Sequence, residues 1–329
     1  MRILVTGASS LIGRRTVDRL VGRGDTVTTL QRTPSGLGTA EILGSVTDPA
    51  VVERACTDQD AIIHLAAKVG VTGSWDEFES VNVLGTVRLL DAARRAGVSA
   101  VVHVSSPSVA HGGRALVGAG AGPADPARTR GHYATSKAMA ELAALDASSL
   151  DLPVVAIRPH LVWGPGDTQL VGRIVARARQ GRLALVGSGA ALIDTTYVDN
   201  AADALVAAVD RVDVLAGRAL VVSNGEPRTV HELVTRIVAA AGVPWTPRRV
   251  PTRLAVAGGS MIERIWDRTG RTDDPPMTGF LAEQLSTAHW FDQRTTREAL
   301  AWEPAVSLAA GFEHLAAWYR EADTPGPNR

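Results

Sequence analysis

The sequence is poor in cysteine, balanced in charge and without a long apolar run. Cys56 is the one cysteine among 329 residues, which excludes an internal disulfide and fits a reducing cytoplasm; we expect it to be a small apolar filler. Thirty-four basic residues cancel thirty-four acidic ones, so no long-range field favours nucleic acid or an anionic membrane. No run approaches the ~18 apolar residues of a membrane span, and the first apolar stretch is too short for a signal peptide. The composition therefore indicates a cytoplasmic protein with no nucleic-acid partner and no transmembrane segment.

Clusters of metal-binding residues are missing as well. No group of His, Cys or carboxylate residues has metal-ligand spacing, so we expect no metal site. What the chain does contain is 45% hydrophobic residues, enough for a large core in one elaborated domain or two.

Short β-branched runs alternate with segments of helical period. The runs are residues 2–6, 25–30, 61–67, 100–106, 154–159 and 219–225, and helical segments such as 83–97 separate them. Alternation of this kind predicts an α/β fold built on a doubly wound parallel sheet. Ligands of such sheets bind at the strand ends near the switch in strand order.

A glycine-rich turn follows the first run and leads directly into a helical segment. Strand, turn and helix N-terminus together make a pyrophosphate site, because free backbone N–H groups and the helix dipole point at the anion. Ser10 stands where a middle glycine is usual; it crowds the pyrophosphate slightly, and its hydroxyl can hydrogen-bond a phosphate oxygen. The turn predicts a dinucleotide cofactor bound by Gly7, Ser9, Ser10, Leu11, Ile12 and Gly13.

The second run ends at Gln31 and Arg32, about where an acidic residue binds the ribose hydroxyls of NAD. Gln31 has no charge to repel a 2′-phosphate, and Arg32 can pair with one through a charge-assisted hydrogen bond. We therefore expect NADP(H) as the preferred cofactor, with NAD(H) possible. The alternative for Arg32 is a solvated loop residue.

Tyr133 and Lys137 lie four residues apart in GHYATSKAMAE, which places them on one face of a helix. An ammonium beside a phenol favours the phenolate, so we expect Lys137 to lower the pKa of Tyr133 from ~10 towards neutrality. A phenol tuned in this way can exchange a proton with an alcohol or ketone.

The segment HVSSPSVAHG places Ser105 and Ser106 just after a strand, at the rim expected for the nicotinamide. At this point the chain resembles the extended short-chain dehydrogenase/reductase family over nearly its whole length. The motifs that carry the resemblance are TGASSLIG (6–13), HLAA (64–67), NVLGT (82–86), the serine segment, YATSK (133–137) and IRPHLVWGPGD (157–167).

The resemblance implies a catalytic trio of Ser106, Tyr133 and Lys137. Counting back from the Val-Ala-His-Gly end of the serine segment selects Ser106 over Ser105. Ser106 would hydrogen-bond the substrate oxygen, Tyr133 would pass the proton, and Lys137 would also hold the nicotinamide ribose. Further positions implied near the site or the cofactor are Asn82, Thr6, Ala66, Ala67 and Pro159.

The family contains simple oxidoreductases, sugar-nucleotide epimerases, dehydratases and inactive sensors. Ser106-Pro107-Ser108 lacks the Asp-Glu pair that dehydration needs, and a sensor commonly loses the Tyr or Lys that this chain keeps. An epimerase needs cations to clamp a nucleotide pyrophosphate. The candidates, which look more like a solvated helix face, are Arg173, Arg177, Arg179 and Arg182.

Candidate substrate residues are Ser108, Trp163 and His160, the last with a hydrogen-bonded structural histidine as its alternative. Apolar residues of the C-terminal portion can form either a tunnel wall or a core and dimer face. They are Leu170, Val171, Ile174, Met261, Ile262, Ile265 and Trp266.

Two longer stretches narrow the substrate. Residues 158–204 look like the branch of 3β-hydroxysteroid and sterol-4-carboxylate dehydrogenases, and residues 275–292 look like bacterial 2-alkyl-3-oxoalkanoate reductases of olefin synthesis. Both groups imply a ketone or secondary alcohol on a large hydrophobic molecule. We expect reduction of a 2-alkyl-3-oxo acid to the 3-hydroxy acid; the alternatives are a 3β-hydroxysteroid dehydrogenase and an NAD-dependent sugar-nucleotide epimerase.

We expect residues 1–160 and 192–225 to form the dinucleotide-binding Rossmann domain. Residues 161–191 and 226–320 would form a smaller region that caps the substrate, and residues 321–329 a flexible tail. The Gly-, Ala- and Pro-rich segment 112–131 can be a loop over the ligand or a plain connection. The resemblance also implies a homodimer formed through helices around Tyr133.

Overall fold

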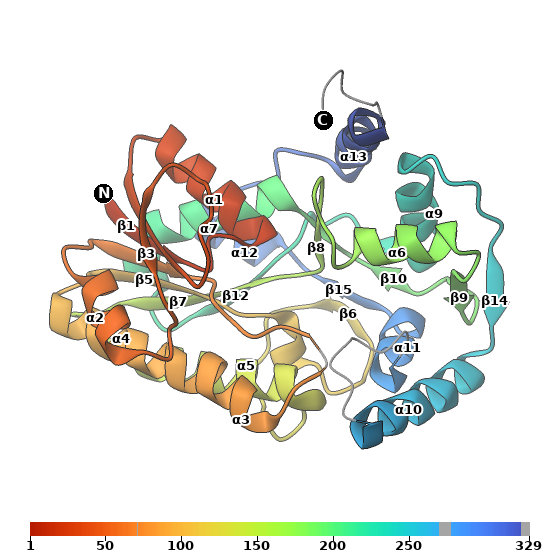
Figure 1. Ribbon diagram of the computed structural model, residues 1–329, viewed down its shortest axis with the longest axis horizontal. Helices are drawn as coiled ribbons and strands as arrows, with labels where there is room; N and C mark the ends of the chain where they lie inside the picture. The colour runs from red at the N-terminus through yellow and green to blue at the C-terminus, as the bar shows by residue number, and fades with distance from the viewer. Residues whose placement is uncertain (71, 270–277, 324–329) are drawn as a thin grey trace.

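A computed structural model describes residues 1–70, 72–269 and 278–323 of the protein. Its centre is a seven-stranded sheet in which every neighbouring pair is parallel (Figure 1). In spatial order the strands are β12 (Ala219–Val222), β7 (Val154–Pro159), β5 (Ala100–Val104), β4 (Ala61–His64), β1 (Arg2–Thr6), β2 (Thr26–Gln31) and β3 (Ala40–Leu43).

The strand order reverses between β1 and β4, which is where a doubly wound sheet binds its ligand. The central strands β4, β5 and β1 are buried on both faces, as their near-continuous apolar sequences predict. The doubly wound α/β fold expected from the sequence is confirmed.

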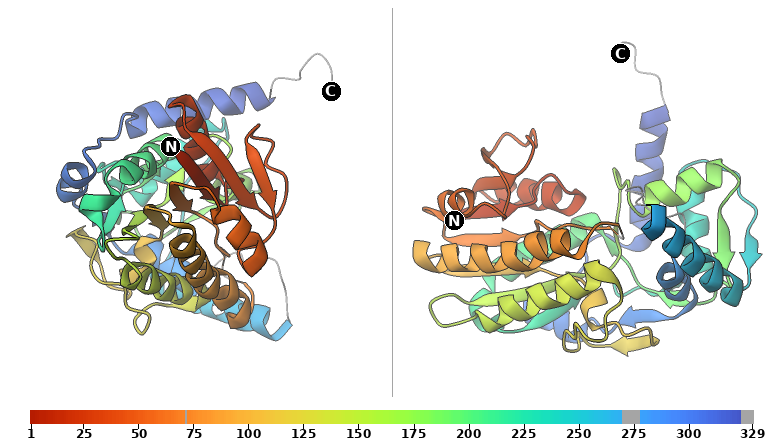
Figure 2. Two further views of the ribbon diagram at one scale, coloured as in Figure 1. Left: turned by 90° about the vertical axis from the view of Figure 1, so that its left-hand side faces the viewer. Right: turned by 60° about the horizontal axis from the view of Figure 1, so that its bottom comes forward.

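One face of the sheet is covered by α1 (Leu11–Gly22), α7 (Val198–Asp210), α8 (Val212–Leu215) and α12 (Arg294–Leu300) (Figures 1 and 2). Their apolar residues share one core cluster with the sheet residues Ile3, Val5, Val102 and Ile157. Residues 294–302 were assigned to the capping region from the sequence. Leu300 and Trp302 belong instead to this core, so the chain returns to the dinucleotide-binding half after β15.

The other face is covered by α2 (Pro49–Cys56), α4 (Gly85–Ala96) and α5 (Gly131–Asp146). Cys56 is buried here, and burial raises the pKa of its thiol to about 12, which fits an apolar filler. Between α3 (Trp75–Phe78) and α4, residues Glu79–Leu84 form a π-helical segment, η1.

The smaller region is built on short strands. A four-stranded sheet has the order β13 (Arg228–Thr229), β10 (Leu192–Ile193), β15 (His289–Phe291) and β6 (Leu116–Ala119). Two further pairs join β11 (Thr196–Tyr197) to β8 (Val162–Trp163) and β14 (Arg248–Val250) to β9 (Ala184–Val186). The helices of this region are α6 (Val171–Arg179), α9 (Val230–Ala240), α10 (Thr252–Thr269), α11 (Gly279–Ser286) and α13 (Leu308–Asp323). The short 3-10 helix η2 (Pro107–Ala110) follows β5 and packs against α5.

A second core fills this region around Trp163. The indole is 1% exposed, stacks on Phe312 with ring centroids 4.5 Å apart, and donates its Nε1–H to Thr195 Oγ1 at 2.9 Å. Val171 belongs to the same cluster, and Leu170 and Ile174 pack against it. These residues form a core, so the prediction that Trp163 contacts substrate is wrong.

Within the described parts of the chain, no helix is both long enough and apolar enough to cross a bilayer. Likewise, no group of three or more His, Cys, Asp and Glu side chains in those parts is placed to hold a metal ion.

Candidate active site

The turn after β1 is shaped by two glycines that no other residue can replace. Gly7 has φ +72°, and a Cβ there would lie 2.8 Å from the amide nitrogen of Ala66. A Cβ on Gly13 would lie 2.6 Å from the carbonyl oxygen of Gly7, so α1 packs directly on the turn. The first-turn amides of Leu11 and Ile12 have no acceptor inside a helix. This cradle fits the pyrophosphate of a dinucleotide.

Ser10 caps α1. Its Oγ accepts a hydrogen bond from Gly13 N at 3.1 Å and donates one to Gly7 O at 2.9 Å. The hydroxyl proton is therefore committed to the turn, whereas the sequence suggested that it would reach a phosphate oxygen. Ser10 stands at the cleft described next, and Ser9 is exposed beside it.

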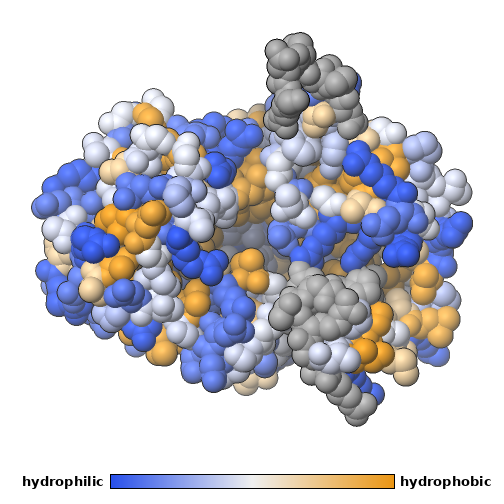
Figure 3. Space-filling view, in the orientation of Figure 1, coloured by the Kyte–Doolittle hydropathy of each residue, from blue (hydrophilic) through white to orange (hydrophobic). Residues whose placement is uncertain are grey.

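A cleft of about 1270 Å³ opens at the carboxyl ends of β1, β4, β5 and β7. In the view of Figure 3 the molecule is hollowed near its centre, between the sheet and the capping region. On the cofactor side, the cleft is lined by Ser10, Ile12, Ala67, Val104 and Pro159. On the capping side, α10 and α11 contribute Val256, Ser260, Glu263, Trp266, Glu283 and Gln284.

Ser106, Tyr133 and Lys137 meet on this cleft, and so does Ser108. Tyr133 is partly exposed, whereas Lys137, one turn further along α5, is 4% exposed. The Lys137 Nζ donates a hydrogen bond to the carbonyl oxygen of Val104 at 2.6 Å. The structure thus brings the three residues implied by the family resemblance together.

The pKa shifts of Tyr133 and Lys137 differ from our expectation. Burial raises the pKa of the Tyr133 phenol above its ordinary value, and a side-chain hydrogen bond with Ser106 works in the opposite direction. Burial also lowers the pKa of Lys137 to about 8, with Glu141 opposing the shift. The expected lowering of the tyrosine pKa by Lys137 was wrong, because desolvation of the phenol outweighs its hydrogen bond and the ammonium is directed at Val104.

The two hydroxyls of Ser106 and Ser108 are 2.9 Å apart, and Ser106 Oγ also accepts from Ser108 N. Ser105 is buried beside them, and its amide donates to Ile157 O at 2.7 Å. Ser106 is the serine whose side chain interacts with Tyr133, as the sequence count indicated.

Asn82 lies in η1 and joins the cleft wall to α5. Its Nδ2 donates to Ser136 Oγ at 2.9 Å and to Lys68 O at 3.0 Å, while its Oδ1 accepts from Lys68 N at 2.7 Å. The Asn82 carbonyl accepts from Thr86 Oγ1 at 2.6 Å. Asn82 therefore orients both helix α5 and the segment after β4.

Thr6 lies behind the cleft. Its Oγ1 is 2.8 Å from His64 Nδ1 and accepts from Ala66 N at 3.1 Å. Thr6 thus fixes the turn after β4, against which Gly7 packs. Of Ala66 and Ala67 in that turn, Ala67 lines the cleft.

The end of β2 holds an acidic neighbour that the sequence did not suggest. Gln31 is buried, and its Nε2 donates to Glu41 Oε1 at 2.6 Å. The same oxygen accepts from Ser35 N and Ser35 Oγ, which lowers the pKa of the Glu41 carboxyl. Arg32 is exposed next to this group.

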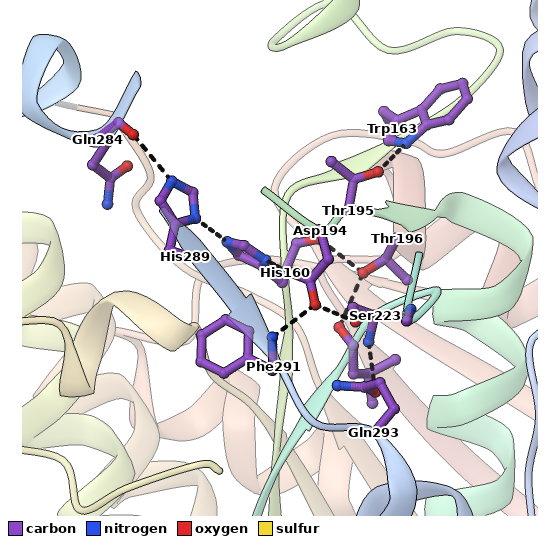
Figure 4. Close-up of polar contacts among 12 residues, drawn as sticks. His160, Trp163, Asp194, Thr195, Thr196, Ser223, Gln284, His289, Phe291 and Gln293 are labelled. Atoms are coloured by element: carbon purple, nitrogen blue, oxygen red, sulfur yellow. Dashed lines mark hydrogen bonds and ion pairs between the residues drawn. The ribbon is translucent and has the colours of Figure 1, made fainter. Parts of the chain in front are cut away.

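His160 does not line the cleft; it is buried behind it, hydrogen-bonded to Asp194 and His289 (Figure 4). Of the apolar residues considered on α10, Trp266 lines the cleft, whereas Met261 and Ile265 are exposed. Residues 275–277, part of one stretch that suggested the substrate, lie outside the described residues.

The cleft also contains side chains that no motif indicated. Arg130, which precedes α5, pairs with Glu283 of α11. Lys68 lies 3.5 Å from Glu77, with its Nζ over the ring of Phe78. These pairs link segments up to 153 residues apart, so local sequence patterns hold no signal for them.

Comparison with known proteins agrees with this architecture. The model of the NAD dependent epimerase/dehydratase family matches residues 3–223. The chain belongs to this family. Within it, a 2-alkyl-3-oxoalkanoate reductase of Stenotrophomonas maltophilia is 40% identical over 326 residues, covering 96% of this chain and 99% of that protein.

Two further similar proteins are informative. A 3 beta-hydroxysteroid dehydrogenase/Delta 5-->4-isomerase of Mycobacterium tuberculosis is 29% identical, covering 97% of this chain and 90% of its own. The solved structure of MoeE5 in complex with UDP-glucose and NAD is 25% identical with a TM-score of 0.76, covering 98% of this chain and all of that one. The chain is thus an oxidoreductase of the extended short-chain dehydrogenase/reductase type.

Proposed function

We propose that this enzyme reduces the ketone of a 2-alkyl-3-oxo acid to the 3-hydroxy acid, with NADPH as reductant and Tyr133 as proton donor. The observation that carries the proposal is the meeting of Tyr133, Ser106 and the glycine turn on one cleft. The 40% identity to a 2-alkyl-3-oxoalkanoate reductase over nearly the whole chain supports the substrate class.

The state of Tyr133 suits the reductive direction. The phenol has an ordinary pKa near 10, which burial raises further, so it keeps its proton at neutral pH and can donate it to the substrate oxygen. Ser106, within reach of the phenol, would hold that oxygen by a hydrogen bond. The bound dihydronicotinamide supplies the hydride, and the protein supplies alignment and polarity.

The lining of the cleft supports a large and partly apolar substrate. Leu161, Val162, Val256 and Trp266 give it apolar walls, whereas Arg130 and Lys68 add cations. The cleft of about 1270 Å³ also has to hold the dinucleotide, whose turn contributes Ser10 and Ile12 to its lining. A steroid fits the same description, so a 3β-hydroxysteroid is the second candidate, supported by the relative of that name.

For the cofactor, we propose that Arg32 pairs with the 2′-phosphate of NADPH. Hydrogen bonds from Ser35 and Gln31 lower the pKa of Glu41, so its carboxylate keeps its charge and limits the preference for NADPH. NADH is then the weaker cofactor rather than an excluded one.

We further propose a homodimer formed through α4 and α5. Leu84 at the end of η1, Val87 of α4 and Leu142 of α5 are exposed, although all three are large and apolar. Light scattering tests this: the native protein should have twice the chain mass, and a L142E variant should shift towards the monomer. A monomeric native protein would exclude it.

A substrate panel tests the activity. Purified enzyme is offered a 2-alkyl-3-oxo acid, a 3β-hydroxysteroid and UDP-glucose, each with both nicotinamide cofactors, and absorbance at the dihydronicotinamide band is followed. We expect NADPH consumption with the 3-oxo acid. Turnover of the steroid alone would select the second candidate, and conversion of UDP-glucose without net cofactor consumption would identify an epimerase.

A further inference from the structure

Three buried side chains form a hydrogen-bonded row behind the cleft wall. Asp194 Oδ1 bonds to His160 Nδ1, His160 Nε2 lies 3.1 Å from His289 Nδ1, and His289 Nε2 lies 3.2 Å from the carbonyl oxygen of Gln284 (Figure 4). Asp194 is fully buried, and both histidines are less than a tenth exposed. We call Asp194, His160 and His289 the relay.

Counting donors shows how many protons the relay holds. The Gln284 carbonyl can only accept, so His289 Nε2 carries a proton. One proton must lie between the two imidazoles, and one between His160 and Asp194. The three hydrogen bonds of the relay therefore need three protons. An ionised aspartate with two neutral histidines supplies only two protons. The relay holds one more, which balances the charge of the carboxylate.

Asp194 has the partners of an ionised carboxylate. Its Oδ2 accepts hydrogen bonds from Ser223 Oγ at 2.7 Å and from Phe291 N at 2.9 Å. The extra proton then belongs to the histidines. Burial and the charge of His160 lower the pKa of His289 to about 3, so His289 is the neutral ring, and the hydrogen-bond geometry places the third proton between His160 and Asp194.

The relay joins the two sides of the cleft. His160 lies between Pro159 and Leu161, which both line the cleft, and Leu161 has φ +41°, a strained conformation for a leucine. The backbone around it is held by Thr196, whose Oγ1 donates to His160 O and whose N donates to Leu161 O. At the other end, Gln284 of α11 lines the capping side.

We propose that Asp194, His160 and His289 are positioning residues that share three protons and thereby fix Leu161 and Gln284, the two walls of the substrate cleft, relative to each other. Loss of the third proton removes one of the three hydrogen bonds. The walls then lose their connection while Tyr133, Ser106 and Lys137 stay in place.

Other charged groups face the relay from each element around it. The ring of His111, near η2, is 6.1 Å from that of His289 in a T-shaped contact. Arg130 and Glu283 act on His111 from the start of α5 and from α11, and they form an ion pair. Their charges cancel, so the relay's own carboxylate is the counter-charge for its third proton.

Nitrogen-15 NMR of histidine-labelled protein tests the proton count without any substrate. H160Q and H289Q variants assign the two rings. At neutral pH we expect both nitrogens of His160 to be protonated and His289 to carry its proton on Nε2. D194N should return His160 to a single proton. Two singly protonated rings in the native protein would overturn the proposal, even if D194N does not fold.

Steady-state kinetics of variants test the positioning role; this second test rests on the proposed function. H289F should raise KM for the 3-oxo acid about 5-fold, the size expected for one buried hydrogen bond, with kcat nearly unchanged. H289Q, which can still donate to Gln284 O, should lie closer to the native enzyme. H314F is the matched control, since His314 bonds to Tyr197 away from the cleft.

The outcomes separate the two claims. If KM in H289F equals that in H314F, or if kcat falls instead, the relay does not position the cleft walls. If the native enzyme does not reduce the 3-oxo acid at all, the proposed function fails, and the NMR result still decides the proton count.

Discussion

Lys137 Nζ donates a hydrogen bond to the carbonyl oxygen of Val104 at 2.6 Å, which ties helix α5 to the end of strand β5. The same bond directs the ammonium towards the sheet edge where the nicotinamide ribose is expected. Burial lowers the pKa of this lysine to about 8, whereas its ordinary value is near 10.5. The charge of Lys137 is therefore lost at a pH where most lysines are still protonated.

Activity should follow this charge. We expect kcat/KM to fall as pH rises through about 8, because the ammonium that binds the Val104 carbonyl, and that we propose also holds the ribose, becomes a neutral amine. The measurement is a pH–rate profile with saturating NADPH. K137M, which has no charge to lose, should be nearly inactive and show no such limb. A native profile that stays flat to pH 10 would contradict this role.

Alanine substitutions at two glycines of α1, Gly13 and Gly22, should have opposite effects. G13A places a Cβ 2.6 Å from Gly7 O and should abolish cofactor binding, which fluorescence titration with NADPH measures. G22A is the control, since its Cβ would meet nothing within 4 Å. That variant should bind cofactor normally and gain about 0.5–1 kcal/mol of stability from its lower chain entropy. Normal binding in G13A would mean that the turn does not hold the pyrophosphate.

Cofactor preference should depend on two neighbouring charges. R32A should lower kcat/KM with NADPH about 10-fold, the loss expected for a charge-assisted hydrogen bond, and leave the value with NADH unchanged. E41Q should shift the preference further towards NADPH, because the carboxylate beside Gln31 is removed. Equal efficiencies with the two cofactors in the native enzyme would refute the assignment of Arg32.

The buried ion pair of Arg158 and Glu141 should contribute to stability. Arg158 Nε donates to Glu141 Oε2 at 2.8 Å, both side chains are 1% exposed, and Arg158 also binds the carbonyls of Ala121 and Gly122. E141A leaves a buried guanidinium unpaired, so we expect the free energy of unfolding to fall by about 3–5 kcal/mol in urea denaturation. A smaller loss than 1 kcal/mol would show that water or Ala121 and Gly122 compensate the charge.

Much of the cofactor half follows from local sequence. Short β-branched runs predict six of the seven strands of the large sheet, all except the edge strand β3, and the turn Gly7–Gly13 lies where strand, turn and helix were expected. The spacing of Tyr133 and Lys137 places both on α5. These features have periodic or local signals, which a single sequence contains.

The capping half has no such signals. β6 lies within a Gly-, Ala- and Pro-rich segment and pairs with β15, more than 160 residues later, so only the fold reveals it. Trp163 looked like a pocket residue because it follows a strand end, but its burial depends on Phe312. His160 and His289 are separated by 129 residues, and a lone histidine does not indicate its partner.

The error on Tyr133 has a similar cause. A charge four residues away is visible in the sequence, whereas desolvation depends on how the whole cleft packs around the phenol. Once the fold is known, the raised pKa indicates a phenol that keeps its proton at neutral pH, which agrees with the reductive direction expected from the sequence.

The most direct test is the rate of NADPH oxidation by the Y133F variant with a 2-alkyl-3-oxo acid. Phenylalanine keeps the ring of Tyr133 and removes the proton, so turnover should fall at least ~100-fold while NADPH binding stays close to native. Turnover equal to the native enzyme would contradict the account, because the proton would then reach the substrate oxygen from another group.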